Sequence, residues 1–167
     1  MNAIDFIKTT IATSRGMTTQ LIMDLKDEPV AQPTTKGGNH ALWILGHLAY
    51  SESSLLHCMI MGKEKCPLNH LKDLFDYNNE PKADASIYPS FDSLLADYES
   101  ARKDTLEYLD SITDADLDDA APGCPDEWKE FFGTKGLCFT FIAIHPSLHS
   151  GQLADTRRAL GRAPLMA

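Results

Sequence analysis

The sequence predicts an all-α protein, a four-helix bundle in which one short and two long connections join four long helices. Apolar residues recur at steps of three and four over four long segments, which is the period of one helix face. No segment alternates apolar and polar residues as a half-buried strand does, and we find neither a glycine-rich phosphate loop nor an internal repeat. With 167 residues, the chain is expected to form a single domain over 1–167.

The first helix is expected from about Asn2 to Lys26. Its stripe has apolar ends and a polar middle, since Ser14 and Thr18 occupy two of its positions. These two residues either line a central cavity or mark a rotation of the buried face. Both interpretations are compatible with the sequence.

The second helix follows a loop over Pro33–Gly38 and is expected to run to about Gly62, with Asn39 as its N-cap. The segment Ala41–Tyr50 is apolar nearly all round, which predicts a helix buried on most sides. Residues 63–89 form the longest irregular stretch, with a short helix over Leu68–Phe75. Long ordered connections of this kind often cover a site or cross the end of a bundle.

The third helix is expected to begin after Ser90 as cap and to end near Ser111. Residues 114–133 again appear irregular, with two prolines and a glycine close together. The fourth helix is expected from about Thr134 to Leu160, where Gly161 would end it.

Composition and charge argue against several classes of function. The net charge of −9 and the pI of about 5.0 would repel a nucleic-acid backbone. The densest basic group, Arg157, Arg158 and Arg162, lies at a predicted helix end, where cations face the negative end of the helix dipole. No apolar run is long enough to cross a bilayer, and residues 1–10 lack the pattern of a secretion signal.

The cysteines show neither a C-x-x-C pair nor zinc-ribbon spacing. Together with the missing signal, this favours reduced thiols and a cytoplasmic location. The four residues are Cys58, Cys66, Cys124 and Cys138.

His145 and His149 are four residues apart on the fourth predicted helix, so their imidazoles can converge on one ion. Pro146 stands where a metalloprotease H-E-x-x-H motif has glutamate, so that motif is rejected. The pair is equally compatible with one core histidine and one exposed histidine.

His47 favours the metal interpretation, because it lies in the most apolar stretch of the chain. Histidines on two packed helices can reach one ion, since helix axes are about 8–10 Å apart. Three neutral imidazoles plus water form the open arrangement of a catalytic metal, and zinc, nickel or iron would suit these ligands. The sequence therefore predicts a divalent metal site at His47, His145 and His149.

Two motifs resemble those of the DinB/YfiT-like metalloenzyme superfamily over essentially the whole chain. They are Gly46-His47-Leu48 and His145-x-x-x-His149-x-Gly151-Gln152-Leu153-x-x-x-Arg157-Arg158-x-Leu160-Gly161. The resemblance implies an up-up-down-down bundle, often dimeric, with a long connection between helices 2 and 3 and a divalent metal on the three histidines. It also implies a small-molecule substrate, no nucleic-acid partner, and in some relatives a low-molecular-weight thiol such as bacillithiol or mycothiol.

We therefore expect a metal-dependent enzyme that activates a thiol or water, as a thiol-dependent transferase or isomerase or as a hydrolase. Zinc or nickel is the expected metal. The alternative functions are a non-catalytic dimeric bundle with a vestigial metal site and a small-molecule binder with a structural metal.

One residue departs from a regular helix-4 motif. Pro146 lacks an N–H and crowds the carbonyl of Ile142, so the helix should kink or widen there. A kink would either rotate His145 away from the site or aim it inward. The sequence leaves both outcomes open.

Few other side chains are candidates for the site. Gln152, one turn beyond His149, is expected either to orient bound water or substrate or to pack as an ordinary polar residue. Glu52 and His57 are expected at the surface. Trp43 and Phe141 either wall a pocket or belong to the core.

Overall fold

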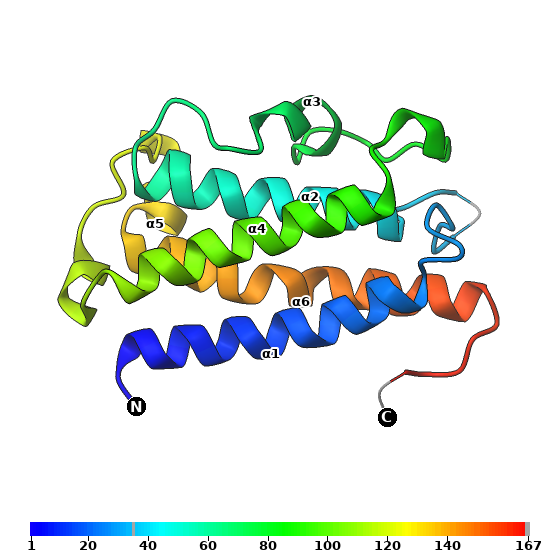
Figure 1. Cartoon of the computed structure of the whole chain (residues 1–167), viewed down its shortest axis with the longest axis horizontal. Coiled ribbons are helices and arrows are strands. Elements are labelled where there is room, and N and C mark those ends of the chain that lie inside the picture. Colours follow the sequence, from blue (N-terminus) through cyan, green and yellow to red (C-terminus); the bar gives the residue numbers. More distant parts are fainter. Residues whose placement is uncertain (35, 166–167) are drawn as a thin grey trace.

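The computed structural model describes residues 1–34 and 36–165 and confirms an all-helical protein. Four long helices run side by side along the long axis of the molecule (Figure 1). They are α1 (Ala3–Asp24), α2 (Ala41–Ser54), α4 (Phe91–Asp110) and α6 (Lys135–Ala159). Thr35, within the loop expected over 33–38, lies outside the described residues, as do residues 166–167.

Short helical elements fill the connections. A π-helical segment, η1 (Leu55–Ile60), extends α2 by six residues, so that the helical run ends close to Gly62 as expected. The short helix expected over 68–75 is present as η2 (Asn69–Leu71) and α3 (Lys72–Phe75). The others are η3 (Ala85–Ile87), η4 (Asp114–Asp118), η5 (Asp126–Trp128) and α5 (Lys129–Phe132).

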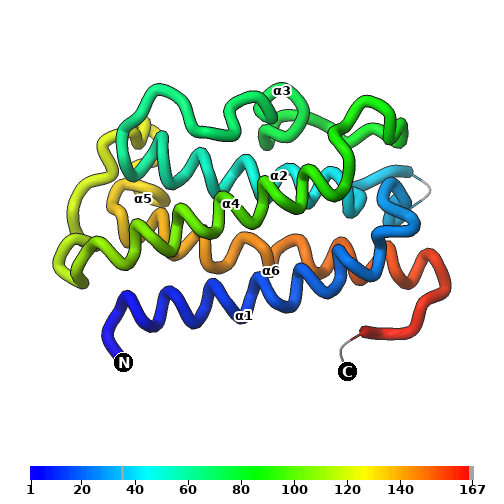
Figure 2. Tube along the Cα trace, in the orientation of Figure 1, coloured from blue at the N-terminus to red at the C-terminus, as the bar shows by residue number. Residues whose placement is uncertain are grey.

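The order of helix directions differs from the up-up-down-down order that the resemblance implied. Ser14 of α1 bonds to Ala143 of α6, and Asp24 pairs with Arg157 further along both helices, so α1 and α6 are parallel. Figure 2 shows α2 and α4 running the other way, which makes the order up, down, down, up. The physical reason is the connection over residues 63–89, which returns along the bundle so that α4 begins at the same end as α2.

The polar middle of α1 faces α6, not an open central cavity. Ser14 Oγ donates to the carbonyl of Ala143 at 2.5 Å, and Thr18 Oγ1 lies 2.8 Å from Ser150 Oγ. Both α1 residues are buried. They satisfy polar groups between α1 and α6.

The ends of the long helices follow the expected capping chemistry with one correction. Ser90 and Thr134 accept backbone N–H groups at the starts of α4 and α6. The cap of α2 is His40, not Asn39, because His40 Nδ1 accepts from the backbone N–H of Trp43 at 3.1 Å. His40 Nε2 also lies 2.9 Å from the carbonyl of Lys82, which ties the long connection to α2.

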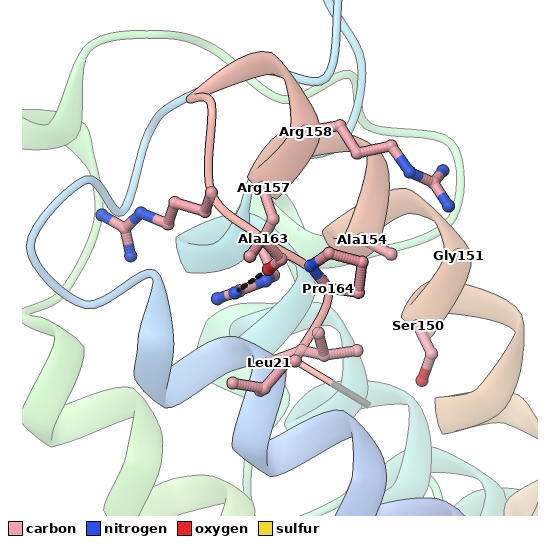
Figure 3. A pocket seen from close by; sticks show the side chains of 10 residues that line it. Leu21, Ser150, Gly151, Ala154, Arg157, Arg158, Ala163 and Pro164 are labelled. Carbon is pink, nitrogen blue, oxygen red and sulfur yellow. Dashed lines mark hydrogen bonds between the residues drawn. The ribbon is translucent and has the colours of Figure 1, made fainter. Parts of the chain in front are cut away.

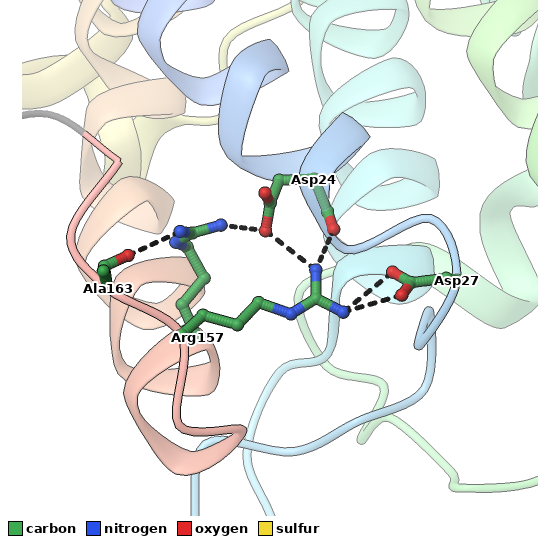
Figure 4. Close-up of polar contacts among 5 residues, drawn as sticks. Asp24, Asp27, Arg157 and Ala163 are labelled. Carbon is green, nitrogen blue, oxygen red and sulfur yellow. Dashed lines mark hydrogen bonds and ion pairs between the residues drawn. The ribbon is translucent and has the colours of Figure 1, made fainter.

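The arginines at the end of α6 bind acidic residues at the end of α1. Arg157 pairs with Asp24, Arg162 pairs with both Asp24 and Asp27, and Arg157 also donates to the carbonyl of Ala163 (Figure 4). Arg157 and Arg162 border a hollow of about 260 Å³ beside Leu21 (Figure 3). Their charges are already neutralised, so the cluster fastens the C-terminal segment and leaves little positive potential for an anion.

Two side chains expected at the surface are buried. Glu52 is 5% exposed and accepts from Arg102 Nη2 at 2.7 Å, and His57 is 7% exposed with Nδ1 3.0 Å from the carbonyl of Ser53. Both face α4, which packs along this side of α2 and η1. A partner on another helix, such as Arg102, is what makes burial of a carboxylate tolerable.

Candidate metal centre

The structure brings together the three histidines that the sequence singled out. His47 comes from α2, and His145 and His149 come from successive turns of α6. His145 Nε2 lies 3.2 Å from Nε2 of His47 and 3.2 Å from Nε2 of His149. One nitrogen of each ring lies within 4.8 Å of the other two, and all three side chains are buried, so the group could hold a metal ion.

Hydrogen bonds orient two of the rings from behind. His47 Nδ1 lies 2.8 Å from the carbonyl of Phe75, which can only accept, so the proton of neutral His47 is on Nδ1. His149 Nδ1 lies 2.8 Å from Gln152 Oε1, and Asn39 Nδ2 donates to the same oxygen at 3.1 Å. Gln152 therefore contacts the ring of His149, a partner that neither expectation for this residue had named.

The resulting tautomers direct nitrogen lone pairs at one another. With protons on Nδ1, the Nε2 atoms of His47 and His149 are both acceptors, and His145 can donate to at most one of them. Lone pairs at this separation repel unless a cation lies between them. The donor set therefore fits a metal better than it fits a closed hydrogen-bonded cluster.

Close packing of Gly46 against Phe75 positions His47. A Cβ at Gly46 would lie 2.4 Å from the Phe75 ring, so only glycine allows this approach. The approach also brings the Phe75 carbonyl to His47 Nδ1. On its other side, His47 stacks on Trp43 with ring centroids 4.6 Å apart and planes within 9°. Trp43 is thus a buried residue in direct contact with the site.

The structure resolves the open question about Pro146. The proline is buried inside α6, the helix continues through it to Ala159, and His145 points into the cluster. The two α6 rings have centroids 5.0 Å apart. The i,i+4 pair is therefore preserved.

Burial keeps these imidazoles neutral. It lowers the pKa of His47 to about 4, although the Phe75 carbonyl opposes the shift. Burial and the neighbouring His47 and His149 lower the pKa of His145 to about 2, and burial also lowers the pKa of His149. A neutral imidazole is the form that ligates a metal.

The histidine group adjoins a pocket of about 530 Å³, with His47 and His145 in its wall. From α2 the pocket is lined by Ser51 and Ser54. Phe141 lines it from α6, as one of its two interpretations predicted.

Sequence reasoning did not find the remaining lining residues, which include Tyr50, Lys72, Asp76, Tyr77 and Trp128. Except for Tyr50, these residues lie in the two long connections. The only signal for them was the length of those connections, which predicts cover over a site but not the residues that provide it.

A comparison with known families agrees with this geometry. The sequence profile described as the DinB superfamily matches residues 10–153, which include all three histidines. The chain belongs to the DinB superfamily. The matched region of this DinB protein covers α2 and α4 completely and most of α1 and α6. No curated protein matches the sequence. Within the described residues, no helix has both the length and the apolar character needed to cross a bilayer.

Proposed function

We propose that this DinB protein is a metal-dependent enzyme in which His47, His145 and His149 hold a divalent ion against a small-molecule substrate. The observation that carries the proposal is the convergence of three neutral imidazoles, two of which line an accessible pocket. Zinc or nickel suits three imidazole ligands. A bound ion of this kind lowers the pKa of a coordinated water or thiol and polarises a substrate oxygen.

The protein's own residues would bind the ion and orient the rings that hold it. The Nε2 atoms of the three histidines would hold the ion, and the carbonyl of Phe75 and the amide oxygen of Gln152 fix two of the rings. Trp43 and Phe141 lie against His47 and His145 and limit water around them. Such apolar surroundings strengthen electrostatic interactions within the site.

The reaction proposed first is thiol-dependent transfer or isomerisation with a low-molecular-weight thiol. Hydrolysis is the second choice. This order rests on resemblance to characterised DinB/YfiT-like proteins. A structural metal in a non-catalytic dimer or in a small-molecule binder is the alternative. Structural sites usually enclose the ion with four protein ligands, whereas this group has three histidines beside a pocket, which favours catalysis. A homodimer is part of the same proposal.

Metal analysis of protein purified without a histidine tag tests the ligand set. We expect near-stoichiometric zinc or nickel after loading, lost in His145→Ala and retained in His70→Ala. His70 is a matched control, since it is an exposed histidine in η2. Absence of stoichiometric metal under every loading condition would overturn the proposal.

Activity separates the catalytic role from the structural one. Conjugation of electrophiles with a panel of small thiols should depend on the metal, and chelation should abolish it while the bundle stays folded by circular dichroism. A bundle that unfolds when the metal leaves, with no metal-dependent turnover on the panel, would instead establish the structural alternative.

A further inference from the structure

The pocket beside the three histidines has an almost continuous aromatic wall. Ring centroids are 4.7 Å apart from His145 to Phe141, 5.2 Å from Phe141 to Phe132, 5.7 Å from Phe132 to Trp128 and 5.7 Å from Trp128 to Tyr77. Each spacing lies in the range of direct aromatic contact. The series leads from the histidine group to the outer end of the pocket.

These rings are partly exposed, although Phe132 and Phe141 also pack against the apolar core. All four aromatic side chains beyond His145 line the pocket, and they come from α6, α5, η5 and the segment after α3. Phe141, Phe132 and Trp128 are only partly buried, and Tyr77 is 62% exposed. Four neighbouring aromatic side chains that stay accessible in one pocket leave much apolar surface in water, which marks a binding surface.

The pocket also has a polar lining. Tyr50, Ser51 and Ser54 of α2 contribute hydroxyl groups that can bond to a polar edge of a ligand. Lys72, Asp76 and Glu127 also line the pocket, so it contains more negative than positive side chains. This charge, together with the net charge of −9, disfavours a polyanionic ligand.

We propose that the aromatic wall binds a planar aromatic group of the substrate, with the substrate's reacting end at the three histidines. A flat ring that packs against this aromatic wall gains face or edge contacts that an aliphatic chain lacks. The pocket of about 530 Å³ is in the usual range for a small organic ligand. Placement of the reacting end rests on the proposed function, whereas binding of the ring does not.

Hydroxamates provide a direct test with the zinc-loaded protein, because their polar end binds zinc and their other end can be varied. We expect benzohydroxamate to bind about tenfold more tightly than hexanohydroxamate, which has a flexible apolar chain of similar size. Equal binding of the two, or tighter binding of the aliphatic probe, would overturn the proposal.

Two variants in α5 test whether the aromatic wall causes the preference for the aryl probe. Phe132→Leu keeps apolar volume but removes a ring, so it should reduce the aryl preference to about twofold or less. Phe131→Ala is the matched control, since Phe131 precedes Phe132, is 67% exposed and does not line the pocket. An aryl preference that Phe132→Leu leaves at the wild-type level would contradict the proposed role of the wall.

A metal-free arm separates this inference from the proposed function. Binding of 2-naphthol to metal-free protein can be measured by tryptophan fluorescence and should be saturable. The affinity should fall severalfold in Trp128→Leu and in Phe132→Leu. If the protein binds 2-naphthol but not zinc, the proposed function is refuted and the proposed role of the aromatic wall is unaffected. If the protein binds zinc but neither binds 2-naphthol nor prefers the aryl hydroxamate, only the proposed role of the aromatic wall is refuted.

Discussion

Gly46→Ala tests whether packing behind the site controls metal binding. The added Cβ would lie 2.4, 2.5 and 2.6 Å from three carbons of the Phe75 ring, whereas carbon atoms prefer about 3.5–4.0 Å. The ring must therefore move by roughly 1 Å. Phe75 has no exposed surface, so this movement displaces its surroundings as well.

The expected cost follows from two opposed effects. Overpacking a core costs about 1–3 kcal/mol, and replacing glycine by alanine inside a helix gains about 1 kcal/mol. The net loss of stability should be about 0–2 kcal/mol. A shift of roughly 1 Å also breaks the 2.8 Å contact between the Phe75 carbonyl and His47 Nδ1, and loss of such a supporting bond lowers metal affinity about 10–100-fold.

The assays are urea unfolding of the metal-free protein and zinc competition with a chromophoric chelator. Gly16→Ala is the control, because Gly16 lies within α1 and a Cβ there meets nothing within 4 Å. It should gain about 0.5–1 kcal/mol and bind zinc as the wild type does. The reasoning fails if Gly46→Ala gains the same stability and keeps wild-type zinc affinity.

Three further predictions concern the support of the fold and the site. Burial lowers the pKa of His40 below its ordinary value of 6.5, so below that pH the unfolded chain takes up a proton that the folded chain excludes, and stability falls. His40→Asn, which can cap α2 without titrating, should show a smaller loss in denaturant titrations between about pH 7 and about pH 5; an equal loss would contradict this. Arg102→Met should cost about 3–5 kcal/mol because it leaves Glu52 buried without its cation, and adding Glu52→Leu should recover most of it; additive losses in urea unfolding would count against the pairing. Gln152→Ala should weaken zinc binding about 10–100-fold in competition titrations by freeing the His149 ring, whereas unchanged affinity would exclude this support.

Features encoded within one helix could be predicted from the sequence. The stripes and caps placed the four long helices to within a few residues, because helical period and capping are local. The same holds for His145 and His149, whose spacing alone puts them on one face. His47 could be added because a histidine in an otherwise apolar segment needs a polar partner or a ligand.

Features that depend on distant segments could not be predicted. Glu52 is buried because Arg102, fifty positions away, pairs with it, and no local pattern shows that partner. Trp128 and Tyr77 meet only because two irregular connections, far apart in the sequence, come together at the pocket. The direction of α4 likewise depends on how residues 63–89 return, which their length permits but does not specify.

Pro146 shows how one of these local ambiguities is resolved by a neighbouring helix. A proline in a helix removes one N–H from the backbone ladder and weakens the turn that precedes it. In that turn the carbonyl of Ala143 accepts from Ser14 of α1, and Ser150 Oγ lies 3.3 Å from the carbonyl of Pro146 itself. Hydroxyl groups from two helices thus support the backbone on both sides of His145. The polar middle of α1 and the proline of α6, which looked like separate irregularities in the sequence, therefore lie at the same level of the bundle, with Ser14 and Thr18 bonded to α6 residues on either side of Pro146.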